Sequence, residues 1–163
     1  GLPVGFEAAA GGGKVQQMVY VLDGAYATGT GYIPWDNTIP QNTEGFEVMT
    51  KAITPTSSSS LLRIDVIFVG GHATRGSITA ALFQDTTANC LTVARIKSSN
   101  ANADRHDYGI MTYVMVAGTT SSTTFKVRVG ADSSDAVYFN GNSGGGKYGG
   151  ASKSGIIITE ITP

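Results

Sequence analysis

Two histidines are the residues of this chain best suited to moving a proton. His72 lies in the stretch GGHATRG, and His106 lies in ADRHDYG, where Asp104 and Asp107 are close to it. A histidine beside a carboxylate is a common acid–base pair, but hydrolysis through a covalent intermediate also needs a nucleophile. The sequence contains no G-x-S-x-G motif, and nothing distinguishes one of its many serines from the others. We therefore predict no catalytic residues and interpret the His106 stretch as a solvated loop or a partner contact.

Other polar motifs lack the ligands or the spacing of a metal or phosphate site. Asp132 and Asp135 lie close together in ADSSDA, but the twelve-residue calcium loop that ends in Glu is absent. The single cysteine, Cys90, makes neither an intrachain disulfide nor a cysteine-based metal site, so we expect a small buried residue in a strand. The glycine-rich GGGKYGG around Lys147 lacks the spacing of a phosphate-binding loop. The sequence predicts no metal and no cofactor.

The only tryptophan is the strongest candidate for holding a ligand. Trp35 lies in YIPWDN, close to Tyr32. A tryptophan ring stacks on a sugar or anchors an interface about as readily as it caps a core, so both roles stay open. A second stretch, NADRHDY, offers polar and aromatic groups in a loop, where binding residues concentrate. The candidate receptor contacts are Tyr32, Trp35, Asp104, Arg105, His106 and Tyr108.

The composition indicates one weakly charged domain. Only 14% of the 163 residues are charged and the formal net charge is −1, so we expect no nucleic-acid partner. A neutral saccharide suits such a weakly charged surface better than a nucleic acid does. No segment reads as a signal peptide, and no apolar run is long enough for a membrane helix. The chain starts with Gly1, as expected of a processed product or an excised C-terminal domain.

Alternating apolar and polar residues predict strands after an N-terminal arm. Residues 1–14 are rich in Gly and Ala and indicate an arm or linker, whereas residues 15–163 form the β domain. In LLRIDVIFV one face is apolar throughout and the other becomes apolar towards the end, and TTFKVRV alternates cleanly. Roughly nine or ten such strands without a helical period predict an all-β antiparallel sandwich, jelly roll or barrel.

The stretch FEVMTKAI predicts a strand with two distinct faces. Side chains alternate between the faces of a strand, so residues two apart share a face. Strict alternation sets Phe46, Val48 and Thr50 against Glu47, Met49 and Lys51.

Two further strands carry more apolar surface than one sheet needs. YGIMTYVMV and GIIITEI are apolar on both faces for most of their length. The core covers one face, so we expect another subunit to cover the second in a homotrimer. GIIITEI follows a glycine-rich loop that contains Asn140 and Gly141, the strongest short turn signal. We expect that loop at one end of the sandwich or near the symmetry axis.

Several stretches, in their order and spacing, resemble the C-terminal domains of bacteriophage tail fibres and similar virion appendages. They are GGGKVQQMVYV, TIPQNTEGFEVMTKAITPTSSSSLLRIDV, ALFQDTTANCL, AGTTSSTTFKVRVG and VYFNGNSGGGKYGGASKSGIIITEI. The resemblance extends from about Gly11 to the end of the chain. It implies a jelly-roll β-sandwich, similar to tumour-necrosis-factor-like heads, assembled as a homotrimer without catalytic residues.

The function implied by this resemblance is structural or adhesive. We expect the head domain of a tail fibre or similar appendage, located on the virion and joined to other virion proteins by its N-terminal arm. It would bind a host surface saccharide and would not enter a membrane. Three alternatives stay open: a depolymerase-type tail-spike domain, a capsid decoration or head-fibre protein, and a non-viral trimeric ligand head. A depolymerase needs carboxylates paired across a groove; Glu44 and Glu47 are close in sequence, but nothing in the sequence pairs them across a cleft.

Overall fold

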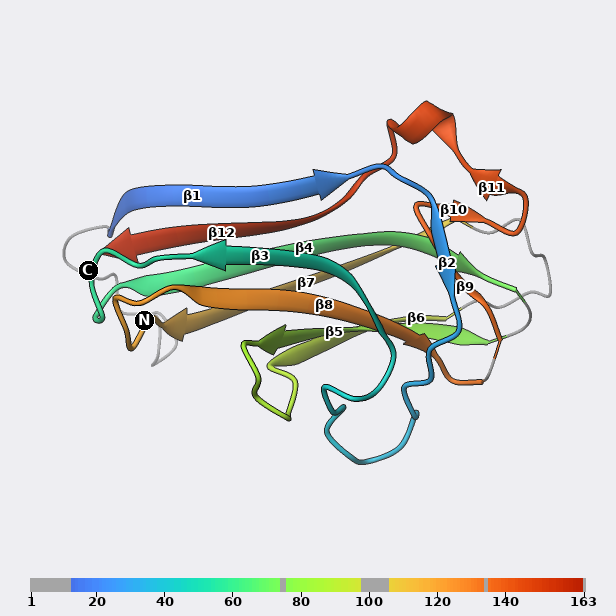
Figure 1. Cartoon of the computed structure of the whole chain (residues 1–163), viewed down its shortest axis with the longest axis horizontal. Helices are drawn as coiled ribbons and strands as arrows, with labels where there is room; N and C mark the ends of the chain where they lie inside the picture. The colour runs from blue at the N-terminus through green and yellow to red at the C-terminus, as the bar shows by residue number, and fades with distance from the viewer. Residues whose placement is uncertain (1–12, 74–75, 98–105, 134, 163) are drawn as a thin grey trace, which may run out of the picture.

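The computed structural model describes residues 13–73, 76–97, 106–133 and 135–162. They form two main antiparallel sheets, whose long strands run along the long axis of the molecule (Figure 1). Within these ranges the only helical element is one 3-10 turn, η1 (Tyr148–Gly150), and no helix could cross a membrane. The predicted all-β antiparallel sandwich is confirmed. The N-terminal arm lies almost entirely outside the described residues and stays a prediction.

The long strands form two sheets, which we call sheet I and sheet II. Sheet I contains β1 (Lys14–Asp23), β12 (Ser154–Thr162), β4 (Leu61–His72) and β7 (Asp107–Val116), extended at one end by β9 (Val137–Phe139) and β2 (Ala27–Gly29). Sheet II contains β3 (Phe46–Ile53), β8 (Thr123–Ala131), β5 (Ser77–Gln84) and β6 (Thr92–Lys97). A small separate hairpin is formed by β10 (Gly141–Asn142) and β11 (Gly145–Gly146).

The pairing of the long strands is nested along the chain. β5 pairs with β6, β4 with β7, β3 with β8 and β1 with β12, all antiparallel. Successive nested pairs alternate between the two sheets, as if one long hairpin had been rolled up. This is the topology of a jelly roll, which agrees with the expected fold class.

The core lies between the two sheets. In β4 the inward face is fully buried over Leu62, Ile64, Val66 and Phe68, as the alternation predicts. The facing side chains of sheet II include Phe125, Val127 and Val129 on β8. Two inner faces of Leu, Ile, Val and Phe exclude water from the space between the sheets, which supplies most of the driving force for this fold.

The predicted alternation of β3 is wrong beyond Val48. Glu47 pairs with Arg128 and Met49 with Val127, so Val48 has no partner of its own across the strand pair. An extra residue of this kind is a β-bulge, and it shifts later side chains to the opposite face. Met49 is consequently buried, and Thr50 is exposed.

Cys90 also differs from its prediction. It lies in the loop before β6 rather than in a strand, and its side chain is only half-buried. Its N–H donates to the carbonyl of Pro40 at 3.0 Å. Burial raises the pKa of the Cys90 thiol, so the thiol stays protonated and packs beside Phe83.

The outer face of sheet I is apolar and exposed over four neighbouring strands. Its exposed side chains include Met18, Tyr20 and Leu22 on β1, with Ile110, Val114 and Val116 on β7. Ile157 of β12 lies between these two sets and lines a hollow with Met18, Tyr20 and Leu22. Arg63 and Asp65 form an ion pair of 2.9 Å near the middle of the face. Below we call this surface the apolar face of sheet I.

The Asn-Gly pair does not form the hairpin turn that the sequence suggested. Asn140 joins β9 to β10 with a φ of +54° and is almost fully buried. Its amide donates to the carbonyls of Asp23 and Ala25 at 2.7 and 3.0 Å, and its Oδ1 accepts from the Ser154 hydroxyl at 2.7 Å. Asn140 therefore joins the end of β1 to the start of β12, at the end of the sandwich where the glycine-rich loop lies (Figure 1).

At the opposite end of β12, a carboxylate is completely buried. Glu160 accepts hydrogen bonds from Gln17 Nε2 at 2.7 Å and from the N–H and hydroxyl of Thr56 at 2.8 and 2.7 Å. Removal from water would raise the pKa of Glu160, but these bonds outweigh it and lower the pKa to about 2. The ionised side chain therefore fastens β1 and the β3–β4 loop to β12.

Candidate ligand-binding surface

A loop of residues 30–45 connects β2 to β3 and covers the outer face of sheet II. Ile33 is fully buried with Ala81 and Phe83, which point outward from β5. The Ile33 N–H donates to the carbonyl of Ala131 at 3.0 Å. The buried side chain of Ile33 thus holds the first half of the loop on the sheet.

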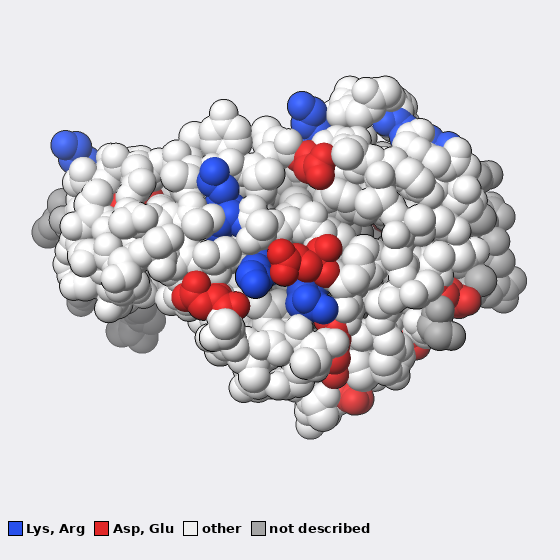
Figure 2. All heavy atoms as spheres, in the orientation of Figure 1, with Lys and Arg blue, Asp and Glu red and all other residues white. Residues whose placement is uncertain are grey.

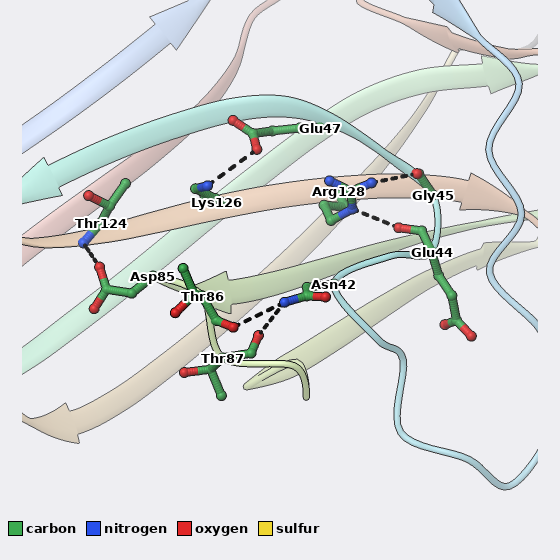
Figure 3. A network of polar contacts seen from close by, with 10 residues as sticks. All are labelled: Asn42, Glu44, Gly45, Glu47, Asp85, Thr86, Thr87, Thr124, Lys126 and Arg128. Carbon is green, nitrogen blue, oxygen red and sulfur yellow. Dashed lines mark hydrogen bonds and ion pairs between the residues drawn. The ribbon is translucent and has the colours of Figure 1, made fainter.

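The second half of the loop is held where it enters β3. Gly45 has a φ of +62°, and a Cβ there would lie 2.6 Å from the carbonyl oxygen of Val129, so only glycine fits. Arg128 donates from Nε to the carbonyl of Glu44 at 2.7 Å and from Nη2 to that of Gly45 at 2.8 Å (Figure 3). The loop is therefore a fixed structure on sheet II.

Trp35 is presented by this loop with its ring in solvent. The side chain is 72% exposed, and the guanidinium of Arg95 lies 3.8 Å from the ring centroid. Asp132 holds Arg95 by an ion pair of 3.0 Å. Since the guanidinium covers only one face of the ring, the other is available to a ligand. The alternative in which Trp35 seals the core is wrong.

A shallow hollow lies beside the ring, and below we call it the Trp35 hollow. It is lined by Pro34, Trp35, Asp36, Thr38, Pro40, Thr79, Val93 and Arg95. Asp36 accepts from the hydroxyl and N–H of Thr38 at 2.6 and 2.8 Å, which lowers its pKa. An aromatic face, a carboxylate and hydroxyls together match the apolar and polar sides of a sugar ring.

The two aspartates of ADSSDA serve protein contacts. Burial favours a higher pKa for Asp132, but hydrogen bonds from the Ser77 N–H at 3.0 Å and from Arg95 lower it overall. Asp135 accepts from the Ser133 hydroxyl at 2.8 Å. Across the described ranges, no three His, Cys, Asp or Glu side chains are grouped so as to hold a metal ion.

Tyr32 is half exposed but does not line the Trp35 hollow. Its backbone forms a bridge to Ala131, and its carbonyl accepts from Gly45 N–H at 2.9 Å. The structure therefore places the two predicted aromatic residues in one loop without joining them in one hollow.

The second predicted stretch lies on the other side of the sandwich. His106 is half-buried immediately before β7, with its ring 5.9 Å from that of Tyr108 and 6.0 Å from that of Tyr148. Burial is the main cause of a lowered His106 pKa, partly opposed by the Asp107 carboxylate and reinforced by Lys147. Asp104 and Arg105 lie outside the described residues.

Tyr108 is 60% exposed, and its hydroxyl lies 3.3 Å from the Ser152 hydroxyl. It precedes Ile110 by two residues on β7, so both side chains are on the outer side of sheet I. Tyr108 thus continues the apolar face, where the sequence also predicts subunit contacts. The predicted receptor contact at Tyr108 and the predicted subunit contact therefore lie on the same surface.

Arg95 and Tyr148 are site residues that the sequence analysis missed. Arg95 follows Trp35 by sixty positions, and only the pairing of β6 with β5 brings it under the loop. Tyr148 is highly exposed and has a φ of +53°, which is rare for tyrosine. The sequence analysis tested the Tyr148 stretch GGGKYGG only as a phosphate-binding loop, which its spacing excludes.

No family model and no curated protein match this chain. Among solved structures, it is similar to Eiger TNF from S. frugiperda, with a TM-score of 0.49 and 10% identity over 90% of this chain and 92% of that chain. It is also similar to the enzymatically active domain of Bacteriophage CBA120 tailspike protein 4, with a TM-score of 0.31 and 12% identity. That match covers 80% of this chain and 19% of the other. Likenesses at this level carry no conclusion about function.

Proposed function

We propose that this chain is a non-catalytic adhesion module, the trimeric head of a phage tail fibre or similar virion appendage. Its ligand would be a saccharide on the host surface. The resemblance in sequence to tail-fibre C-terminal domains supports the location on a virion. The exposed ring of Trp35, which stacks on Arg95 beside the Trp35 hollow, is the observation that carries the binding role.

A tryptophan ring in solvent forgoes the stabilisation that burial would give it. An indole that is 72% exposed gains little from the hydrophobic effect, although Arg95, itself paired with Asp132, stacks on one face of it. A rigid aromatic face loses little conformational entropy when a ligand stacks on it. Such a ring suits a ligand with a flat apolar patch and hydroxyls at its edge, which describes a pyranose sugar.

Assembly through the apolar face of sheet I is the second part of the proposal. Exposed Met, Tyr, Leu, Ile and Val side chains spread over β1 and β7, on either side of the partly exposed Ile157 of β12. This is more apolar surface than a soluble monomer usually leaves in contact with water. Closed three-fold symmetry would bury this face and leave the Trp35 hollow, on the outer side of sheet II, open to a ligand. Three weak sites per head would then add through avidity.

Trp35→Ala tests the binding role. We expect labelled heads with this substitution to lose at least about tenfold in retention on an array of bacterial surface polysaccharides, since stacking contributes about 1 kcal/mol or more per site. Trp35→Phe, which keeps an aromatic face, should retain part of the signal.

The proposal is wrong if folded Trp35→Ala heads bind the same polysaccharides as tightly as the parent. Shortening of a bound polysaccharide by the parent would favour the depolymerase alternative instead. Size-exclusion chromatography of each bound product distinguishes these outcomes.

A further inference from the structure

A second hollow lies on the same outer side of sheet II, on the opposite flank of the 30–45 loop from Trp35. It is lined by Asn42, Glu47, Phe83, Asp85, Thr86, Lys126 and Arg128. Figure 2 shows basic and acidic side chains gathered near the middle of this face, on a surface that is otherwise mostly uncharged. Below we call this second hollow the polar hollow.

Arg128 brings a fixed cation to the polar hollow. Its Nε and Nη2 are bound to the carbonyls of Glu44 and Gly45, which fixes the plane of the guanidinium (Figure 3). The other amino group, Nη1, has no hydrogen-bond acceptor among the residues that the structure describes. A guanidinium already held in place loses little entropy when its free edge binds a planar anion.

Lys126 is the second cation and lies two residues before Arg128 on β8, so both side chains share the outer face of the strand. Its Nζ contacts one carboxylate in the described part of the chain, that of Glu47, at 3.8 Å. Both side chains of this pair are over a third exposed, so solvent screens their attraction. A ligand anion could therefore replace Glu47 at Lys126 at little cost.

Asp85 does not compete for these cations. Its Oδ1 accepts from Thr124 N–H at 2.7 Å and its Oδ2 from the Thr123 hydroxyl at 2.8 Å. This carboxylate therefore fastens the start of β8 to the β5–β6 turn. In the polar hollow, Lys126 and Arg128 therefore have N–H groups that can donate to a ligand. Glu47 is the acceptor that is weakly held there.

The rim of the hollow adds groups that suit hydroxyls. Asn42 donates its amide hydrogens to the carbonyls of Thr86 and Thr87 at 3.1 and 3.2 Å, and its Oδ1 has no donor within the described ranges. The Thr86 hydroxyl is likewise without a bond to any described residue. A ligand with a carboxylate and neighbouring hydroxyls would satisfy both the cations and these groups.

We infer that the polar hollow binds the carboxylate of an acidic sugar, between Lys126 Nζ and the free edge of Arg128. The ring hydroxyls then face Asn42, Thr86 and Glu47. This site is separate from the Trp35 hollow and requires no contact with Trp35.

Titration of the isotope-labelled protein with glucuronate tests the inference, with glucose and acetate as reference ligands. We expect amide shifts confined to residues 42–47, 83–87 and 124–128, saturating at millimolar glucuronate, and at least about tenfold weaker binding of glucose. Lys126→Gln should weaken glucuronate binding about tenfold, whereas Trp35→Ala should leave it unchanged.

Lys153→Gln is the matched control, because it removes the same charge from an exposed residue outside the hollow. The inference is overturned if glucuronate causes no shifts there, or if Lys126→Gln and Lys153→Gln weaken binding equally. Acetate binding as tightly as glucuronate would overturn the assignment to a sugar. Failure of the Trp35 array experiment alone would leave this site standing.

Discussion

At the scale of single residues, the buried carboxylate of Glu160 has the clearest consequence for stability. Its pKa is about 2 in the folded protein and ordinarily 4.5, so the unfolded chain takes up a proton first as the pH falls. The stabilisation is complete above about pH 4.5 and is lost as the pH falls towards 2. We predict that Glu160→Gln lowers the free energy of unfolding by about 2 kcal/mol at neutral pH, because an amide cannot accept all the hydrogen bonds that this carboxylate accepts.

Urea denaturation between pH 7 and pH 2.5, at one protein concentration, measures this difference. The gap between parent and Glu160→Gln should narrow below pH 4.5, since both side chains are then neutral in the unfolded state. Glu47→Gln serves as control, because its ion pair is exposed and should change stability little. A gap that stays constant down to pH 2.5 would contradict the role assigned to Glu160.

At the scale of elements, the 30–45 loop depends on one backbone conformation. Gly45 has a positive φ, and a Cβ there would meet the carbonyl of Val129. We predict that Gly45→Ala destabilises the protein by about 1–3 kcal/mol and releases the loop from Arg128. Amide exchange at Gly45 and Ile33 should accelerate, while exchange in β4 and β12 should change only through global stability. Unchanged protection of both loop amides would show that the loop is held in another way.

The sequence predicts the elements of this fold better than the contacts between them. Alternation in β4 and β8 correctly identifies the inward residues, because a period of two needs only local information. The bulge at Val48 escapes this reasoning, since it depends on how β3 pairs with β8, far away in the sequence. The contact between Trp35 and Arg95 escapes it for the same reason.

At the scale of the whole molecule, the two outer faces of the sandwich differ in character. The outer side of sheet I is apolar from β1 to β7, with one ion pair, Arg63–Asp65, near its centre. The outer side of sheet II is covered by the 30–45 loop and carries the Trp35 hollow and the polar hollow. This division supports a head that assembles through one sheet and binds ligands through the other.

Light scattering after size-exclusion chromatography tests whether the chain assembles as a trimer through the apolar face of sheet I. The parent should elute with three times the 16.8 kDa mass of one chain at micromolar concentration. Ile110→Glu, which places a charge at a 70%-exposed position of that face, should yield folded monomers, whereas Ile39→Glu in the 30–45 loop should stay trimeric. A parent that elutes as a monomer, or an Ile110→Glu variant that remains trimeric, would show that the apolar face of sheet I is not a trimer interface.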